Sequence, residues 1–434
     1  MPSMEDDLLS ICTDIIEQGV APILSINSGV AYITDPVFGI DRNRANAEVL
    51  KALIRLHMLG VDPVEGDGVR KLMNWILGQQ NEDGSWNEIH SYYNQPSALI
   101  TSLVGESLFL AMEIYHDYEQ LGDCLEKAKQ YVLASELSPG YFLKSAQNYA
   151  DHLNVNASCG AFLAELGQRD RDRKCLDAAR RAARRVCSFQ FNDGAYPYTT
   201  VEKAYSSQSS YVPCIHYQGV TMFYLSRIHR VLGDERVIDS LLHGAKWLAS
   251  VQSEDGHFDW SKSGLMYAYF LSGSHAFAAS AFCYLSQYDN NYFENAYRAL
   301  YPLKKNINGL VNRWEAASLW SLPLSISQTL KTANLGNCTT RHRLFKLGYG
   351  LYKQVARRRY SVNLDDALFR RLSKLMGIKS TWIEPIRNYP DLFMTSEVLD
   401  CLTYSLLWLN QQKGSDPIKL AEANEIHDEG IRRN

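Results

Sequence analysis

A seven-residue signature occurs three times in this chain, each time at the end of an apolar segment with helical periodicity. It has the pattern Q-x-x-D-G-x-aromatic and occupies residues 80–86, 190–196 and 252–258. The Asp-Gly pair supplies the left-handed turn that ends a helix, because glycine has no Cβ to clash there. A repeat on this scale indicates stacked supersecondary units that share one core. We therefore expect Trp86, Tyr196 and Phe258 to pack onto helix ends as structural residues.

The composition limits the class of protein. The 434 residues exceed the usual size of one domain, but a closed ring of repeated units is a known exception. A net charge of −4 gives no electrostatic sign of nucleic-acid binding. The basic run at 180–185 places its arginines on one helix face, where we expect a solvated surface.

The cysteines and the first residues bear on the compartment. The nine cysteines are an odd number, and none stands in a C-x-x-C pair. Because Cys159, Cys187, Cys283 and Cys401 lie in apolar helical segments, we expect buried thiols in a reducing compartment. The acidic first residues do not resemble a signal peptide, and no stretch of 18 apolar residues predicts a membrane span. The sequence predicts a cytoplasmic protein without a transmembrane segment.

Two types of helical segment alternate along the chain, and strand signals are weak. Charged amphipathic segments lie at 66–80, 122–135, 171–190, 234–252, 290–305 and 341–359. Segments richer in small and apolar residues lie at 43–59, 96–115, 151–166, 216–232, 273–287, 313–331 and 393–411. Because a fully buried helix loses its polar stripe, we expect the second type to form an inner ring and the first an outer ring. The sequence predicts an all-α, (α/α)6-like toroid with an extra helix, as one domain over 1–410 with a flexible polar tail over 411–434.

The signature resembles the QW motif of squalene-hopene and related triterpene cyclases, and similar segments occur in protein prenyltransferase β subunits. Residues 151–284 also resemble uncharacterised bacterial toroid proteins of polysaccharide gene clusters. These resemblances imply the toroid architecture. They do not select a chemistry, because one fold hosts many activities.

The catalytic motifs of those families are not intact in this sequence. The D-x-D-D acid motif of triterpene cyclases has its nearest match at 363–366, where asparagine replaces the first aspartate and the run also suits a helix start. The D-D-x-x-D magnesium motif, the D-x-C zinc ligands of prenyltransferases and the Cys/His spacing of lanthionine cyclases are absent from the sequence. No glycine-rich phosphate loop is present either.

Polar residues collect at the predicted starts of the inner helices, which would surround one cavity. Histidine can act as acid or base near neutral pH, and tyrosine can assist it. We predict that the catalytic residues are Asp35, Asp151, His152, His216, Tyr217 and His275. We predict substrate contacts from Gln95, Asn154, Asn156, Tyr196, Tyr198, Gln218, Arg313 and Glu315. Each has a structural alternative, since aspartate also caps helices and histidine is often satisfied in a core.

The polar mouth and the 26 tyrosines favour a carbohydrate-active enzyme of the lyase, hydrolase or epimerase type, with a role in polysaccharide biosynthesis. Two alternatives stay open. A terpenoid cyclase or isomerase without the usual acid motif would use the tyrosines to stabilise cations, and a non-catalytic toroid would bind a glycan or a protein. We expect a glycan or small-molecule partner and no nucleic acid. Three histidines with Asp151 could hold a metal, but we predict neither metal nor cofactor.

Overall fold

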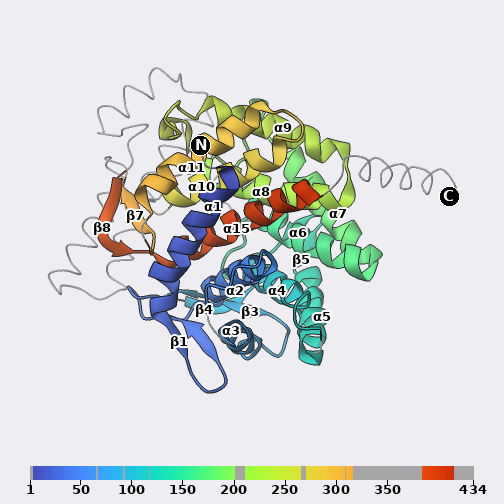
Figure 1. The fold of residues 1–434 in the computed structure, drawn as a ribbon. Helices are drawn as coiled ribbons and strands as arrows, with labels where there is room; N and C mark the ends of the chain where they lie inside the picture. The colour runs from blue at the N-terminus through green and yellow to red at the C-terminus, as the bar shows by residue number, and fades with distance from the viewer. Residues whose placement is uncertain are drawn as a thin grey trace.

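A closed ring of inner helices forms the centre of the computed structural model (Figure 1). The structure describes residues 3–64, 67–90, 93–116, 118–200, 211–264, 270–307, 309–315 and 384–414. Within these residues each inner helix packs against the next, and the last packs against the first. The inner helices are α2 (Asn43–Met58), α4 (Ala98–Ala111), α6 (Leu153–Asp170), α8 (Ile215–Leu232), α10 (Phe270–Leu285) and α15 (Leu392–Gly414).

A second layer of helices surrounds the ring. Each outer helix follows an inner helix in the chain and packs on it, and α1 packs on α15 to complete the layer. The outer helices are α1 (Met4–Asp14), α3 (Gly68–Leu77), α5 (Glu119–Ala134), α7 (Arg173–Ser188), α9 (Glu235–Ser250) and α11 (Asn291–Asn306). This double layer confirms the predicted α/α toroid.

The connections at the two ends of the ring differ in length. At one end an inner helix passes into its outer partner through a short turn, such as 171–172 or 233–234. At the other end the chain returns through longer segments, four of which contain two-stranded antiparallel sheets. The sheets are β1 (Leu24–Ile26) with β2 (Ala31–Ile33), β3 (Trp86–His90) with β4 (Tyr93–Ser97), β5 (Glu136–Ser138) with β6 (Tyr141–Phe142), and β7 (Asn312–Glu315) with β8 (Glu384–Pro390). We call this end, where the inner helices begin, the mouth.

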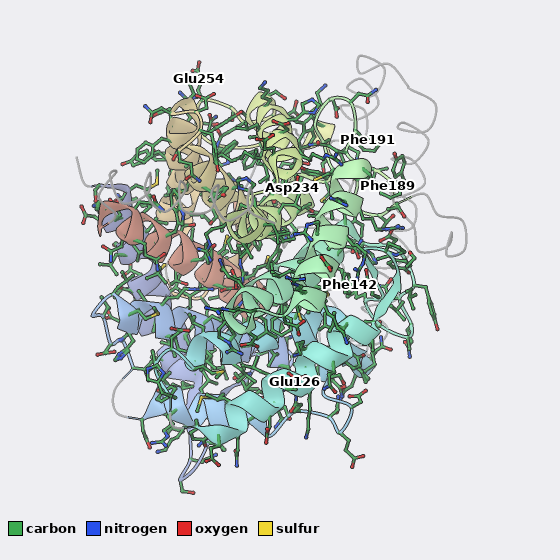
Figure 2. All side chains as sticks on the ribbon, turned by 90° about the vertical axis from the view of Figure 1, so that its right-hand side faces the viewer. Glu126, Phe142, Phe189, Phe191, Asp234 and Glu254 are labelled. Carbon is green, nitrogen blue, oxygen red and sulfur yellow. The ribbon has the colours of Figure 1, made fainter. Side chains whose placement is uncertain are left out.

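Helix α7 shows how the sequence pattern produces an outer helix. Its buried residues are small, mostly alanines spaced three or four apart, and its arginines lie on other faces. Asp172 caps its first turn, with Oδ1 accepting from the backbone N–H of Lys174 at 2.9 Å. The basic run is only partly solvated, because Arg181 pairs with Glu136 and Arg185 with Asp151. In the side view of Figure 2, Glu126 on α5 and Glu254 lie on the outside of the layer.

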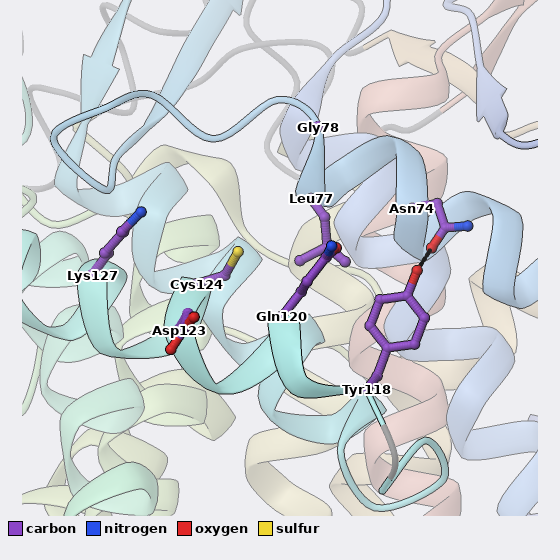
Figure 3. Close-up of a pocket in the computed structure, with 8 residues that line it drawn as sticks. All are labelled: Asn74, Leu77, Gly78, Tyr118, Gln120, Asp123, Cys124 and Lys127. Atoms are coloured by element: carbon purple, nitrogen blue, oxygen red, sulfur yellow. Dashed lines mark hydrogen bonds between the residues drawn. The ribbon is translucent and has the colours of Figure 1, made fainter.

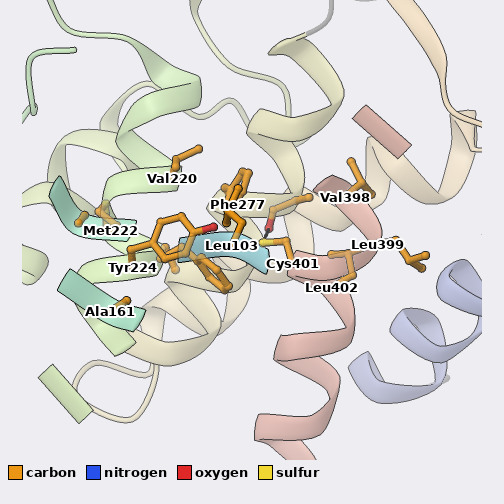
Figure 4. Close-up of a cluster of buried hydrophobic side chains, with 14 of the residues drawn as sticks. Leu103, Ala161, Val220, Met222, Tyr224, Phe277, Val398, Leu399, Cys401 and Leu402 are labelled. Carbon is orange, nitrogen blue, oxygen red and sulfur yellow. Dashed lines mark hydrogen bonds between the residues drawn. The ribbon is translucent and has the colours of Figure 1, made fainter. Parts of the chain in front are cut away.

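The apolar core fills the space between the layers and part of the ring. Figure 4 shows side chains of α4, α6, α8, α10 and α15 meeting in one cluster around Leu103, Tyr224 and Phe277. Cys401 belongs to this cluster, and Cys159 and Cys283 are also buried, as predicted, while Cys187 is half-buried. Burial raises the pKa of the Cys159 thiol to about 12, so that thiol is a packing group.

Each signature forms a tight turn against the next outer helix. Gly84 has φ of +86°, and Gln80 donates from Nε2 to the carbonyl oxygens of Gly84 and of Cys124 on α5, at 3.1 and 2.9 Å. Gln190 makes the same pair of bonds to Gly194 and to Ser240 on α9. Trp86, Tyr196 and Phe258 are almost fully buried. The structural role predicted for these three aromatic residues is confirmed.

Three details differ from the expected helix pattern. The predicted inner helix at 313–331 begins in strand β7, and the rest of it, like the helix predicted at 341–359, lies outside the described residues. Helix α15 continues past the expected domain end at 410 to Gly414. Its Leu392–Lys413 segment is, in the described part of the chain, the one helix long and apolar enough to cross a membrane, yet it is largely buried between α2 and α10. Length and mean hydropathy therefore fit an inner helix of the ring.

Candidate functional site

Several of the predicted residues meet at the mouth. Tyr198 precedes α8 and stacks on Tyr217 of that helix, with ring centroids 4.1 Å apart. His152, at the start of α6, packs on the Tyr198 ring at 4.6 Å. His216 meets the edge of Tyr217 at 4.9 Å. The structure thus brings two predicted histidines and two predicted tyrosines into one aromatic group.

A carboxyl group from α15 completes this group. His216 Nε2 lies 3.8 Å from Glu397 Oε1. Helices α8 and α15 are separated in the ring by α10, so this contact crosses the interior of the mouth. Arg44 of α2 binds Glu397 through Nη2 at 2.6 Å and Glu48 through Nε at 2.7 Å. An imidazole, a guanidinium and two carboxyl groups therefore converge where the inner helices begin.

Burial shifts the pKa values of Glu397 and His216. Burial raises the pKa of Glu397 to about 7, and the nearby Glu48 carboxylate adds to the rise, while Arg44 opposes it. Burial, with the charge of Arg44, lowers the pKa of His216 to about 3. Near neutral pH the imidazole is therefore neutral, and Glu397 exchanges a proton in the range where general acid–base catalysis works best.

A second charged group borders the mouth on the β3–β4 side. Glu88 binds Lys144 at 2.9 Å and lies 3.4 Å from His90 Nε2. Lys144 and His90 hold the pKa of Glu88 well below its usual range, although burial opposes this. Arg42 reaches His90 Nδ1 at 3.3 Å and pairs with Asp35 at 3.2 Å. Asp35 also accepts hydrogen bonds from the backbone N–H groups of its own turn, so its carboxylate stabilises this turn and holds Arg42 in place.

Four buried acceptor oxygens near the mouth have no hydrogen-bond partner among the described residues. They are Oδ1 of Asn43 and Asn154 and Oε2 of Glu88 and Glu397. Asn154 lies about three helical turns before Glu165 on α6, and Glu165 reaches into the ring interior to Arg227, so both residues share the inward face. A buried acceptor without a partner is costly, and a ligand that donates hydrogen bonds would relieve that cost.

Four predicted site residues have structural roles instead. Asp151 binds Arg185, Thr200 and Asn156 behind the helix start. The Asn156 side chain accepts from the backbone N–H of Phe142 at 2.9 Å, and Gln218 accepts from that of Tyr196 at 2.7 Å. Tyr196 donates to or accepts from Ser240 in the core. These contacts occupy the polar atoms and turn the four side chains toward the layer between the rings.

Asn156 and Gln218 belong to a clamp that recurs around the ring. The side chain of the fourth residue of an inner helix accepts a hydrogen bond from the backbone of the segment that precedes that helix. The bonds are Ile33 to Asn46, Trp86 to Thr101, Phe142 to Asn156, Tyr196 to Gln218 and Val311 to Thr395, at 2.7–3.0 Å. His275 is the sixth residue of α10, and it packs 5.0 Å from the signature residue Phe258, as Gln218 contacts the signature residue Tyr196. His275 is therefore equivalent to Gln218 and does not join His152 and His216 at the mouth.

The remaining predicted residues lie at the rim. Gln95 on β4 stands opposite Glu88 in the hairpin and donates to Ser145 at 3.1 Å. Arg313 and Glu315 lie in β7 rather than at a helix start, and only their backbone is described. In the described part of the chain no three His, Cys, Asp or Glu residues form a metal-binding group. The predicted roles of these rim residues remain predictions.

The inner helices also carry charge below the mouth, which contradicts the expectation that they lack a polar stripe. Lys51 on α2 binds Glu106 of α4 at 3.1 Å and Asp400 of α15 at 2.5 Å. Arg227 of α8 binds Glu106 at 3.0 Å, and this bond crosses the ring because α6 separates α4 from α8. The signal was present in the sequence: Arg44, Glu48, Lys51 and Arg55 recur at the helical spacing of one face. The prediction of an apolar inner helix over 43–59 does not take this spacing into account.

A separate hollow lies on the outer wall, between α3 and the start of α5 (Figure 3). It has a volume of about 390 Å³, and Asn74, Tyr118, Asp123 and Lys127 are among its lining residues. Tyr118 donates to Asn74 Oδ1 at 2.6 Å across it. It contains none of the residues that converge at the mouth, so we place the candidate site at the mouth.

Comparisons with known proteins support the architecture. No protein family model matches the sequence, and no curated protein is similar to it. Solved structures do match. A possible member of the GH105 family from Salmonella enterica is 11% identical, with a TM-score of 0.58, over 94% of this chain and 95% of that one. Cellobiose 2-epimerase from Bacillus thermoamylovorans is 9% identical, with a TM-score of 0.55, over 71% and 89%. A family 76 glycoside hydrolase from Bacteroides thetaiotaomicron is 12% identical, with a TM-score of 0.55, over 94% and 78%. At these identities the likeness shows the fold, so the chain is an α/α toroid of the kind that these three proteins have.

Proposed function

We propose that this protein is a carbohydrate-active enzyme that transfers protons to and from a sugar bound at the mouth. One observation carries the proposal. Glu397, a buried carboxyl group with a pKa raised to about 7, faces His216 across the mouth beside the Tyr198–Tyr217 stack. Such a carboxyl group can act as a general acid or base on a bound sugar, and an aromatic surface can pack against the sugar ring.

The unpartnered acceptors indicate the kind of ligand. Glu88 Oε2, Glu397 Oε2 and Asn154 Oδ1 are buried and can accept hydrogen bonds. Sugar hydroxyl groups can donate to all three, while the exposed part of the half-buried Tyr198–Tyr217 stack can pack against the apolar face of a ring. A bare hydrocarbon would leave these acceptors unsatisfied.

The residues would divide the chemistry among them. Glu397 in its acid form would donate a proton to a leaving or ring oxygen, and in its ionised form would accept one. His216, neutral at pH 7, would accept or relay a proton on the same side of the substrate. Arg44 would hold the carboxyl groups of Glu48 and Glu397 in place through its two short contacts. The same set can serve hydrolysis, elimination or epimerisation.

The similar solved structures agree with this substrate class. They include a cellobiose 2-epimerase, an unsaturated glucuronyl hydrolase specific for heparin and an α-1,6-mannanase. We infer from the site, and not from the fold alone, that this chain also acts on a carbohydrate. A role in polysaccharide biosynthesis and a cytoplasmic location stay predictions from the sequence.

The terpenoid cyclase alternative is disfavoured by the ring interior. A cavity for a hydrocarbon cation should be lined by aromatic and aliphatic groups. Below the mouth the interior holds Lys51, Glu106 and Asp400 in ion pairs instead. A polar substrate fits this surrounding better.

The test is turnover of sugars by the full-length protein. Cellobiose, α-1,6-mannotriose and an unsaturated glucuronyl disaccharide represent the epimerase, hydrolase and uronide classes, with products followed by NMR and mass spectrometry. We expect one class to react, and Glu397→Gln and His216→Ala to lower kcat by a factor of about 100 or more. His229→Ala is the matched control, because His229 lies on the same helix at the opposite end, bonded to Tyr284.

Three outcomes would contradict the proposal. Binding of a sugar without turnover would make the protein a glycan-binding toroid. Conversion of squalene instead of any sugar would favour the cyclase alternative. Equal losses of activity in His216→Ala and His229→Ala would show that the first acts through stability and not through the site.

A further inference from the structure

The carboxyl groups of Glu48 and Glu397 share Arg44 but differ in their other contacts. Glu48 accepts from Arg44 and also from Ser396 Oγ, at 2.7 and 2.6 Å. Glu397 accepts from Arg44 at 2.6 Å, and its Oε2 has no partner among the described residues. Because hydrogen-bond donors stabilise the ionised form, Glu48 is the better-supported carboxylate.

The next helical turn places charges of both signs near the two carboxyl groups. On α2, Lys51 follows Glu48 by three residues and places a cation below it, fixed by Glu106 and Asp400. On α15, Asp400 follows Glu397 by three residues and places an anion below it. Residues three apart are neighbours on a helix surface. Burial and the Asp400 anion raise the pKa of Glu48 as well as that of Glu397. Arg44 opposes this rise at both carboxyl groups, whereas Lys51 and the Ser396 hydroxyl oppose it at Glu48.

The burial of Lys51 makes its charge effective. Its side chain is 1% exposed, so water screens the ammonium little. Burial of a lysine is rare unless it is paired, and Lys51 is paired twice. The charged or titratable groups that face the carboxyl pair are Arg44 and Lys51 from α2, Glu106 from α4, His216 and Tyr224 from α8, and Asp400 from α15.

We propose that Lys51 is a positioning residue of the mouth: its ammonium keeps Glu48 ionised, so that the proton shared by the two carboxyl groups resides on Glu397. The unpartnered Oε2 of Glu397 then carries this proton toward the ligand. This proposal rests on the proposed function for its catalytic meaning. The location of the proton, however, can be measured without substrate.

The experiment records the carbonyl stretch of protonated carboxyl groups by infrared difference spectroscopy as the pH of the full-length protein is varied. In the wild type we expect one such band titrating near neutral pH, absent from Glu397→Gln and retained in Glu48→Gln. In Lys51→Met the proton should divide between the two carboxyl groups. A second band, removed by Glu48→Gln, should appear, and the apparent midpoint should rise by on the order of one pH unit. Lys51→Arg should restore the single band.

A matched control separates the charge of Lys51 from the general loss of a buried ion pair. Lys129 on α5 also binds two carboxylates, Glu126 at 2.6 Å and Asp172 at 3.3 Å, far from the mouth. Lys129→Met should leave the spectrum unchanged. If Lys51→Met does not fold, the double variant Lys51→Met with Glu106→Gln removes a cation and an anion together and can be measured in its place.

The outcomes are separable from those of the functional test. An unchanged band and midpoint in folded Lys51→Met would overturn the proposal, as would a wild-type band that persists in Glu397→Gln. Absence of turnover on every sugar, with the expected spectral changes, would overturn the proposed function and leave the proton assignment standing. If an active substrate is found, the pH optimum of kcat should shift with the infrared midpoint in Lys51→Met and return in Lys51→Arg.

Discussion

At the scale of the single residue, opposing electrostatic influences act on the buried side chain of Glu397. Burial and the Glu48 carboxylate raise its pKa from an ordinary value of 4.5 to about 7, against the attraction of Arg44. The folded state therefore binds this proton more tightly than the unfolded chain does. By linkage, the resulting stabilisation is complete below about pH 4.5 and is lost as the pH rises through 7.

This shift predicts a pH dependence of stability. Relative to Glu397→Gln, which is neutral at every pH, the wild type should lose up to about 3 kcal/mol of its free energy of unfolding between pH 5 and 8. Urea denaturation of both proteins at these two pH values measures the difference. Parallel changes in the two proteins would show that Glu397 does not take up the proton in the folded state.

The sequence predicted part of the site and missed part of it for identifiable reasons. His152, His216, Tyr198 and Tyr217 were found because polar residues at helix starts stood out in apolar segments. The prediction that His275 belongs to the same site as His216 rests on its place near a helix start, whereas in the structure His275 contacts Phe258 as Gln218 contacts Tyr196. Contacts such as that between His216 and Glu397 join residues far apart in the chain, and no local pattern shows which helices face each other.

At the scale of the element, the structural repeat extends beyond the sequence signature. Glycines with positive φ lie against the next outer helix at Gly84, Gly140, Gly194 and Gly256, where an added Cβ would collide with its backbone. Gly309 also has positive φ, and a Cβ there would lie 3.2 Å from Gln18 after α1. The sequence showed three of these turns, because the Gln and Asp of the signature are missing around Gly140 and Gly309. What the fold requires at each turn is the left-handed backbone and the absence of a Cβ.

Gly84 provides a direct test of this requirement. A Cβ at this position would lie 2.5 Å from the carbonyl oxygen of Lys127, and φ is +86°. We expect Gly84→Ala to destabilise the protein by about 3 kcal/mol or more, since both the backbone and the packing must shift. Gly233→Ala is the control, because φ is +60° there and no atom lies within 4 Å, so about 1 kcal/mol is expected. Equal losses in thermal denaturation would mean that the contact with α5 can relax.

At the scale of the whole molecule, ion pairs join α2, the first inner helix in the chain, to α15, the last one. Asp400 of α15 binds Lys51 and Arg55 of α2, both at 2.5 Å, in a buried setting. We call these ion pairs of Asp400 with Lys51 and Arg55 the polar seam. The sequence predicts a closed ring but not this seam, because the inner helices are expected to be apolar throughout.

This seam should be sensitive to loss of its anion. Asp400→Asn leaves two buried cations with less compensation, and we expect a loss of about 3–5 kcal/mol in the free energy of unfolding. Asp177→Asn removes the exposed partner of Arg180 on α7 and should cost less than about 1 kcal/mol. A loss for Asp400→Asn as small as for Asp177→Asn would show that closure of the ring depends on apolar packing alone.

The contact between the first and the last described helices has a topological consequence. Glu5 at the beginning of α1 binds Lys413 at the end of α15 at 3.2 Å, so the two elements that are farthest apart in the chain are neighbours in the ring. A ring of equivalent helix pairs has no obligatory first unit. The gene could therefore be circularly permuted by linking α15 to α1 and opening new ends at the short turn 233–234, away from the mouth. In such a permutant the polar seam between α2 and α15 would become an ordinary internal contact, formed between consecutive units of the chain.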